Sequence, residues 1–211
     1  MLDFITIKEN TEYTLTEKKS KFIANLIKVE NQEKAEDIIK QYKKKYHDAR
    51  HNCIAYRVLE KEQIIEKSND DGEPSGTAGA PMLNILQKNN LCNVLIIVTR
   101  YFGGVLLGTG GLVRAYSEAT TGAINEASMD NIAIGVEAKV TLDYNNFEKF
   151  QYYCRINEIE LINTEYLDNI VCNIAMEEDK KEKLLKDYEE KNINLNSLDF
   201  FGKKIITKSK I

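Results

Sequence analysis

The chain has 211 residues, of which 43% are hydrophobic, and its formal net charge is −4 at pH 7. This composition supports a packed core and excludes global disorder, and the charge balance excludes a polycation that binds nucleic acid through bulk charge. The longest continuous apolar run, Val94–Val98, is far shorter than the ~20 residues that span a bilayer. We therefore expect no association with a membrane.

The N-terminal segment and the cysteines both indicate a cytoplasmic protein. The segment MLDFITIKEN lacks the basic and apolar regions of a signal peptide. The four cysteines show no CxxC spacing, which favours free thiols: Cys53, Cys92, Cys154 and Cys172. The sequence leaves the oligomeric state open.

The first elements in chain order are a strand region and a helix. Residues 12–29 alternate weakly between apolar and polar positions and are rich in β-forming residues, which predicts strand structure. Residues 31–46 carry apolar side chains at helical spacing, which predicts an amphipathic helix. The other face of this helix is a solvated surface or a contact with RNA, and it carries Lys40, Lys43, Lys44 and Lys45.

The next elements indicate a sheet with helices packed on it. Residues 51–59 predict a strand and residues 81–88 a short helix. Residues 93–100 are almost continuously apolar, so we expect a central strand covered on both faces. Residues 112–127 predict a helix whose alanine-rich face packs closely on the sheet.

The second half of the chain predicts a separate small domain. Its elements are expected as a strand at 136–144, a helix at 147–157, strands at 158–166 and 170–177, a helix at 179–191 and a strand at 198–207. This β-α-β-β-α-β order is typical of a ferredoxin-like domain. We therefore predict an α+β protein with domains at residues 1–130 and 131–211.

Glycine is concentrated in one part of the chain. Nine of the eleven glycines and both prolines fall within residues 72–122, and residues 100–116 read RYFGGVLLGTGGLVRAY. Glycines before a helix allow successive N–H groups to converge on an anion, although the same pattern also serves a tight turn. The sequence has no GxxxxGK[ST] motif. The candidate ligand- or phosphate-binding residues are Arg100, Tyr101, Gly103, Gly104, Gly108, Thr109, Gly110, Gly111 and Arg114.

A second glycine-rich stretch, SNDDGEPSGTAGAP at residues 68–81, carries three carboxylates, Asp70, Asp71 and Glu73. They could hold Mg²⁺ beside a phosphate, accept backbone N–H groups in a tight loop, or pair with Arg100 and Arg114. An acid–arginine network is favoured over a metal, so we assign no metal or other cofactor. The supporting-loop residues are His51, Asp70, Asp71, Glu73, Ser75 and Thr77.

Known catalytic patterns are missing from the sequence. His47 and His51 lie outside any HExxH motif, and a Cys53–His51 dyad has no evident residue to orient the histidine. Ser75 and Ser117 have no nucleophile elbow. We assign no catalytic residue and favour a protein without enzymatic activity.

Three stretches carry a family resemblance. HNCIAYRV, DDGEPSGTAGAPML and VTRYFGGVLLGTGGLVRAY resemble, in order and spacing, motifs of the YigZ/IMPACT family, over residues 15–127. Residues 136–207 resemble the C-terminal domain of its bacterial members. The resemblance implies a mixed four-stranded sheet backed by helices, like a small-subunit ribosomal protein and domain IV of elongation factor G. It implies a ferredoxin-like second domain, similar to domain V of that factor.

The resemblance also implies a role in translation. Eukaryotic relatives compete at a ribosome-associated activator of an initiation-factor kinase, and no accepted reaction accompanies the family. The favoured hypothesis is a regulator that binds RNA or the ribosome, with Tyr101 and Phe102 stacking on an unpaired base. The alternatives are an enzyme or sensor for a small phosphorylated ligand, with or without Mg²⁺, and a protein-interaction module.

Overall fold

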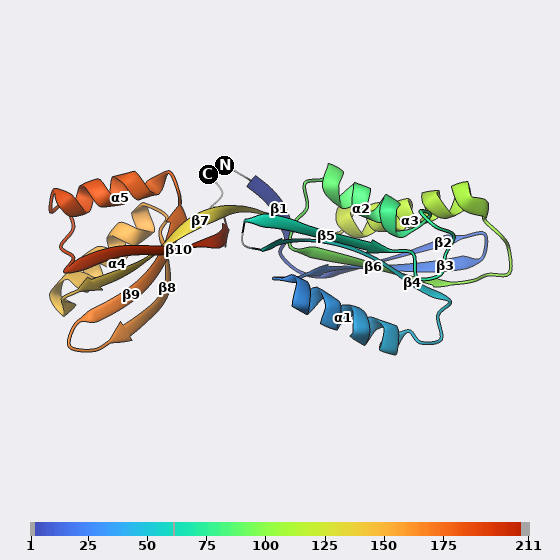
Figure 1. Ribbon diagram of the computed structural model, residues 1–211, viewed down its shortest axis with the longest axis horizontal. Coiled ribbons are helices and arrows are strands. Elements are labelled where there is room, and N and C mark those ends of the chain that lie inside the picture. The colour runs from blue at the N-terminus through green and yellow to red at the C-terminus, as the bar shows by residue number, and fades with distance from the viewer. Residues whose placement is uncertain (1–2, 61, 208–211) are drawn as a thin grey trace. The chain divides into compact units, whose positions relative to one another are not determined.

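The computed structural model describes residues 3–60 and 62–207 as two compact units, and the predicted two-domain α+β class is confirmed (Figure 1). The larger unit comprises Phe4–Asp130, and the smaller one comprises Asp3 together with the chain from Asn131 onward. In the described ranges, none of the helices combines the length and the apolar character needed to cross a bilayer. All four cysteines are free and buried.

The larger unit contains a sheet with the strand order β2-β3-β6-β4-β5. Its strands are β2 (Thr11–Glu17), β3 (Ser20–Lys28), β4 (His51–Glu60), β5 (Gln63–Asn69) and β6 (Val94–Tyr101). Each of the four pairings is antiparallel, so the expected mixed sheet of four strands is wrong. The additional strand, β5, lies at the edge of the sheet, and its polar, exposed sequence QIIEKSN lacks a clear alternation.

The predicted strand region 12–29 is a hairpin rather than one strand. Glu17 pairs with Ser20, and the two residues between them, Lys18 and Lys19, have φ angles of 44° and 67°. Two-residue hairpin turns with positive φ usually contain glycine or asparagine. Since neither residue type is present, the sequence carried no signal for this turn. A short strand, β1 (Asp3–Ile7), precedes the hairpin.

Helices cover both faces of this sheet (Figure 1). Helix α1 (Gln32–Lys45) lies on one face and matches the prediction, and the Asn31 side chain caps it by accepting the Lys34 N–H. Helices α2 (Gly79–Lys88) and α3 (Gly108–Asn125) lie on the other face. Helix α3 begins four residues before the predicted start, so the predicted turn glycines from Gly108 onward are helical.

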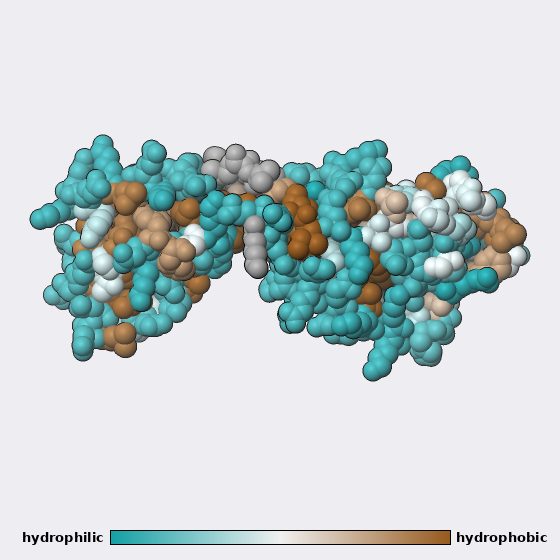
Figure 2. Space-filling model, viewed as in Figure 1, coloured by the Kyte–Doolittle hydropathy of each residue, from teal (hydrophilic) through white to brown (hydrophobic). Residues whose placement is uncertain are grey.

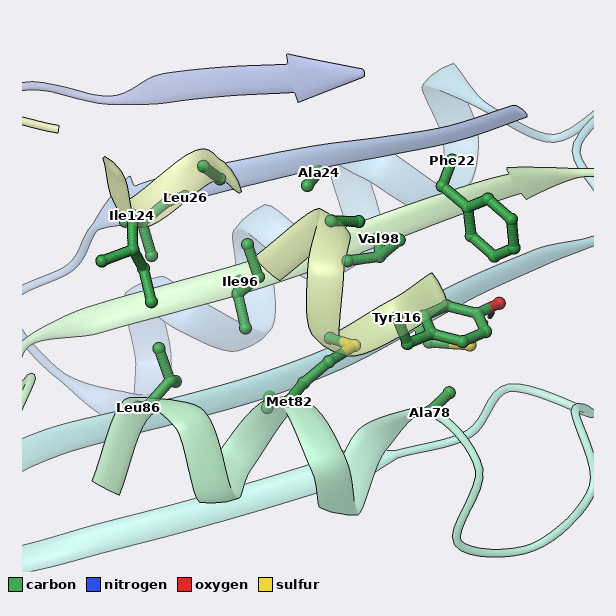
Figure 3. Close-up of a cluster of buried hydrophobic side chains, with 14 of the residues drawn as sticks. Phe22, Ala24, Leu26, Ala78, Met82, Leu86, Ile96, Val98, Tyr116 and Ile124 are labelled. Carbon is green, nitrogen blue, oxygen red and sulfur yellow. Dashed lines mark hydrogen bonds between the residues drawn. The ribbon is translucent and has the colours of Figure 1, made fainter. Parts of the chain in front are cut away.

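Strand β6 is central and is buried from Val94 to Arg100, as predicted. Its side chains alternate between two clusters of buried residues. Val94, Ile96 and Val98 belong to the cluster that includes Met82, Leu86 and Tyr116 of α2 and α3 (Figure 3). Leu95 and Ile97 belong to the cluster that includes Ala35 and Ile39 of α1. The strand therefore holds the three helices in place and carries Arg100 to the end of the sheet.

The smaller unit has its own sheet and its own core. Its elements are β7 (Met129–Leu142), α4 (Tyr144–Ile156), β8 (Glu160–Tyr166), β9 (Ile170–Glu177), α5 (Lys180–Glu189) and β10 (Ser197–Thr207). Strand β7 pairs with β10 and β9, and β9 pairs with β8, all antiparallel. Buried residues from both helices and from the sheet form the core, among them Val140, Phe150, Cys172 and Leu184.

Candidate functional site

One end of the larger unit's sheet brings the glycine-rich stretches together. Arg100 near the end of β6 pairs with His51 at the start of β4 on one side and with Phe22 of β3 on the other. The loop after β5 and the loop before α3 close over these residues. The two stretches singled out in the sequence are therefore neighbours in space, although 18 residues (82–99) lie between them in the chain.

Glu73 is the centre of a buried polar cluster. Its Oε1 accepts hydrogen bonds from Arg100 Nη1 at 2.7 Å and from the Tyr116 hydroxyl at 2.8 Å. The side chain of Glu73 is only 3% exposed, and Arg100 is buried as well. The acid–arginine pair favoured from the sequence is therefore Glu73–Arg100. Arg100 was also predicted to bind phosphate, and in the structure its guanidinium already forms an ion pair with Glu73.

Two further groups of this cluster remain protonated. Burial raises the pKa of the Tyr116 hydroxyl far above its usual range, so the hydroxyl is a permanent donor to Glu73. Burial also raises the pKa of the Cys53 thiol to about 12, and its Sγ donates to the carbonyl oxygen of Asp70. A thiol held in this form is a weak nucleophile.

One ring nitrogen of His51 is within hydrogen-bond distance of a backbone carbonyl, and the other lies near the carboxylate of Glu73. Its Nδ1 lies 2.9 Å from the carbonyl oxygen of Asp71, which can only accept, so Nδ1 carries the proton. In the neutral ring, Nε2 is therefore an acceptor. It lies 3.8 Å from Oε2 of Glu73, and no hydrogen bond within the described ranges ends on that oxygen. With the neutral ring, two acceptor atoms therefore face each other, whereas a protonated ring would form an ion pair with Glu73 here.

Asp70 holds the loop to the start of α2. Its carboxylate accepts the backbone N–H groups of Gly76, Ala78 and Gly79 at 2.8–3.0 Å. Burial alone would raise the pKa of this carboxyl, but the three backbone donors together lower it. The carboxylate satisfies N–H groups at the helix N-terminus that have no partner within the helix.

Substituting Asp70 with alanine should lower the free energy of unfolding by about 2 kcal/mol at pH 7, the upper range for lost helix caps. Because the folded-state pKa is lowered, this contribution is present above the unfolded pKa of about 4. It is lost as the pH falls through the folded value. Native-state hydrogen exchange at pH 7 and urea unfolding at pH 7 and pH 3 check this expectation. Asp48→Asn is the control, because it removes an exposed charge and keeps an acceptor for the Tyr101 hydroxyl. If the stability lost in Asp70→Ala does not become smaller in acid, the assignment is contradicted.

The remaining residues of the acidic loop also have internal partners. Asp71 accepts the Asn52 N–H at 2.7 Å and the Lys43 ammonium at 2.5 Å. Thr77 donates its hydroxyl to the Pro74 carbonyl, whereas Ser75 is exposed. Within the described residues, no group of three or more His, Cys, Asp or Glu side chains could hold a metal ion.

The glycines before α3 have different structural roles. A Cβ on Gly103 would lie 2.0 Å from the Lys19 carbonyl, so this position needs glycine for close approach to the β2–β3 turn. Gly104 and Gly108 have φ angles of 84° and 74°, which favour glycine. Leu107 is the N-cap residue of α3, and its side chain makes no capping hydrogen bond. Among residues 3–60 and 62–207, no side chain accepts from the first N–H groups of α3, which include those of Thr109, Gly110 and Gly111.

A cavity of about 450 Å³ lies at this end of the sheet. The predicted residues that line it are His51, Glu73, Arg100, Gly108 and Thr109. Phe102, which was expected to stack on a base, also lines the cavity. The remaining walls come from residues that were not assigned to the site: Arg50, Gly72, Pro74, Leu106, Leu107 and Leu112. The leucines lie within the motif VTRYFGGVLLGTGGLVRAY, but as apolar residues they resemble ordinary core positions. Arg50 differs from other surface cations only in preceding His51.

Other predicted residues lie outside the cavity lining. The Tyr101 hydroxyl donates to Asp48, and Arg114 is exposed on α3, where a Cβ on Gly110 would lie 3.8 Å from its guanidinium. Around the loop before α3, hydrophobic atoms gather at the end of the larger unit (Figure 2). Leu106 in this loop is 83% exposed. The region therefore combines a free helix N-terminus, exposed arginines and an apolar surface.

The fold and this site define a two-domain α+β protein with a ligand-sized cavity beside a glycine-rich helix N-terminus. The Impact N-terminal domain matches residues 18–124, and a domain of unknown function (DUF1949) matches residues 140–187. The chain therefore belongs to the IMPACT family, as the sequence motifs predicted.

The similar proteins include full-length bacterial relatives. "IMPACT family member YvyE" of Bacillus subtilis is 37% identical over 175 residues, which cover 83% of this chain and 80% of the relative. An "IMPACT family member" of Haemophilus influenzae is 32% identical over 193 residues, covering 91% and 94%. A crystal structure of a hypothetical protein aligns with a TM-score of 0.66 at 27% identity, covering 96% of this chain and 98% of the other.

Proposed function

We propose that the chain is a non-catalytic, translation-associated regulator that binds RNA or the ribosome in the cytoplasm. The observation that carries this proposal is the uncapped N-terminus of α3 with exposed arginines beside it. Helix N-termini favour phosphate, and arginine can form two hydrogen bonds with it. Family membership supports the proposal through the role in translation that the resemblance implies.

The charge distribution at this end of the larger unit also supports RNA binding. Exposed lysines from the β2–β3 turn and the end of α1 flank the loops, although the whole chain is acidic: Lys18, Lys19, Lys21, Lys44 and Lys45. A local cationic surface is sufficient to attract phosphate. In this proposal the buried Glu73–Arg100 ion pair stabilises the loops, and the exposed Arg50 and Arg114 bind the phosphates of the RNA.

The architecture of both units is compatible with such a role. The β-α-β-β-α-β order of the smaller unit and its strand order β10-β7-β9-β8 support a ferredoxin-like domain over residues 131–211. We propose that residues 1–130 form an IMPACT-type domain related to domain IV of elongation factor G. Likeness of fold to translation proteins favours RNA binding only by analogy.

Co-sedimentation with ribosomes and separated subunits tests the proposed function. We expect wild-type protein to pellet with the ribosome at ~50 mM salt and to dissociate toward ~200 mM, as phosphate contacts require. Arg50→Glu and Arg114→Glu should each weaken binding and reduce the slope of log affinity against log salt by about one.

The matched control is Lys28→Glu, which reverses an exposed charge at the opposite end of β3. It should leave the affinity and its salt dependence unchanged. Wild-type protein that stays in the supernatant at low salt, or binding that does not change with salt, would overturn the proposal.

The cavity favours a second function, an enzyme or sensor for a small phosphorylated ligand. Its volume of about 450 Å³ is in the range of small-molecule sites. A thermal-shift screen of phosphorylated metabolites with and without Mg²⁺ tests it. A ligand at 100 times its dissociation constant should stabilise the protein by ~2.7 kcal/mol. No response across the screen would contradict this function.

A further inference from the structure

Aromatic and arginine side chains at the cavity could stack on a flat ring. Phe102 is 38% exposed, and the guanidinium carbons of Arg50 and Arg100 lie 5.4 Å and 5.6 Å from the centroid of its ring. Leu106 and Leu112 add apolar walls. Nucleobases stack on aromatic rings and on arginine guanidinium groups, and unpaired bases are the ones available for such contacts.

Buried side chains that line the cavity carry polar atoms that have no hydrogen bond in the described part of the chain. Glu73 Oε2 and His51 Nε2 lie 3.8 Å apart, and both residues line the cavity. With His51 neutral and its proton on Nδ1, as we take it to be in this inference, both atoms are acceptors. Arg100, which is 95% buried and also lines the cavity, has an Nε without a hydrogen-bond partner in the part of the chain that the structure describes. Buried polar groups are normally hydrogen-bonded, so these atoms indicate a polar ligand.

Two adjacent acceptors select a particular base edge. Guanine presents two neighbouring donors, its ring N1–H and its exocyclic N2 amino group. Adenine and cytosine present one donor beside an acceptor, and uracil presents one N–H between two carbonyl groups. The Glu73–His51 pair of acceptors therefore matches guanine better than the other three bases.

The rim of the cavity is suited to the phosphate of the same nucleotide. Gly108 and Thr109 in the first turn of α3 line the cavity, and no side chain of the described ranges caps this turn. Arg50 lies at the rim and is exposed. An anion at this position would accept backbone N–H groups and lie at the positive end of the helix dipole.

We infer that the cavity binds one unstacked guanine nucleotide, with the base edge on Glu73 and His51 and the phosphate on the first turn of α3. The nucleotide belongs to a single-stranded segment of RNA or is a free guanine nucleotide, since both offer the same chemistry. The RNA source rests on the proposed function, whereas the free nucleotide does not.

Fluorescence anisotropy with short, labelled oligonucleotides of equal length tests the inference. Single-stranded uridine oligomers carry guanine, inosine, adenine or an abasic ribose at one central position, so the number of phosphates is constant. The guanine oligomer should bind about tenfold more tightly than the adenine and abasic oligomers, the effect of one hydrogen bond to a charged group. Inosine, which lacks the 2-amino group, should lose most of this preference.

Protein variants provide a second readout. Phe102→Ala should weaken binding of the guanine oligomer at least about fivefold, the lower range for base–aromatic stacking, and leave the abasic oligomer unaffected. The matched control is Phe201→Ala, which removes an exposed aromatic ring of β10 in the other unit and should change neither affinity.

A parallel arm titrates guanosine and adenosine 5′-monophosphate and inorganic phosphate. Equal affinity for guanine, adenine and abasic oligomers would overturn the inference and leave salt-dependent RNA binding in place. Preferential binding of guanosine monophosphate without binding of any oligomer would support the cavity assignment and contradict the proposed function. Absence of binding in both arms would overturn both.

Discussion

Glu73→Ala should lower the free energy of unfolding of the larger unit by about 3–5 kcal/mol, because removing one partner of a buried ion pair leaves an uncompensated charge. Glu73 accepts hydrogen bonds from Arg100 and Tyr116, and its side chain is almost fully buried. Native-state hydrogen exchange of the β6 amides measures this loss, since core strands exchange mainly through global opening.

Two further variants distinguish the loss of stability caused by an unpaired buried charge from the loss caused by any carboxylate-to-alanine substitution. Asp37→Ala removes the partner of an exposed lysine, Lys40, and should cost less than about 1 kcal/mol. Adding Arg100→Met to Glu73→Ala should recover part of the loss, because the buried cation is then removed as well. If Glu73→Ala lowers the free energy of unfolding no more than Asp37→Ala does, the buried ion pair does not stabilise the fold.

Gly103→Ala should cost about 3 kcal/mol, the upper range for overpacking, because the new methyl group would overlap the backbone of the β2–β3 turn. The Cβ would lie 2.0 Å from the carbonyl carbon and oxygen of Lys19, and backbone atoms cannot move aside as a side chain can. The same exchange experiment on the β6 amides checks this expectation, together with exchange at Ser20, at the start of β3.

Gly110→Ala is the matched control within the same stretch. This glycine lies in the first turn of α3, and the nearest atom to an added Cβ is 3.8 Å away. Alanine has a higher helix propensity than glycine, so the variant should be neutral or up to about 1 kcal/mol more stable. Equal exchange in the two variants would show that glycine is not needed at position 103.

The predicted elements are most accurate where the hydrophobic period is strong. The fully apolar run of β6 and the helical spacing in α1 allowed both elements to be located from the sequence. Strand β5 is polar and exposed because it needs only one neighbour at the sheet edge, so its sequence has no strand pattern. The turn at Lys18 and Lys19 depends on the pairing of β2 with β3, which is a tertiary feature.

The two glycine-rich stretches of the candidate site were visible in the sequence, but the pairing of their charged residues could not be predicted. Three carboxylates lie within four residues, and both Arg100 and Arg114 were candidate partners for them. The fold determines which carboxylate pairs with Arg100. Asp70 accepts backbone N–H groups at the start of α2, and Glu73 alone of the three carboxylates bonds to Arg100. Leu107 became part of the cavity only through its position before α3.

The internal bonds of the acidic loop also bear on how quickly a partner would be captured. Asp70 and Thr77 form bonds within the loop, and Asp71 ties it to Asn52 and Lys43, so its conformation is set before anything binds. A preformed surface loses little conformational entropy on association. Encounter with a partner would then require no rearrangement of this loop, and partners would be distinguished mainly by how long each complex lasts.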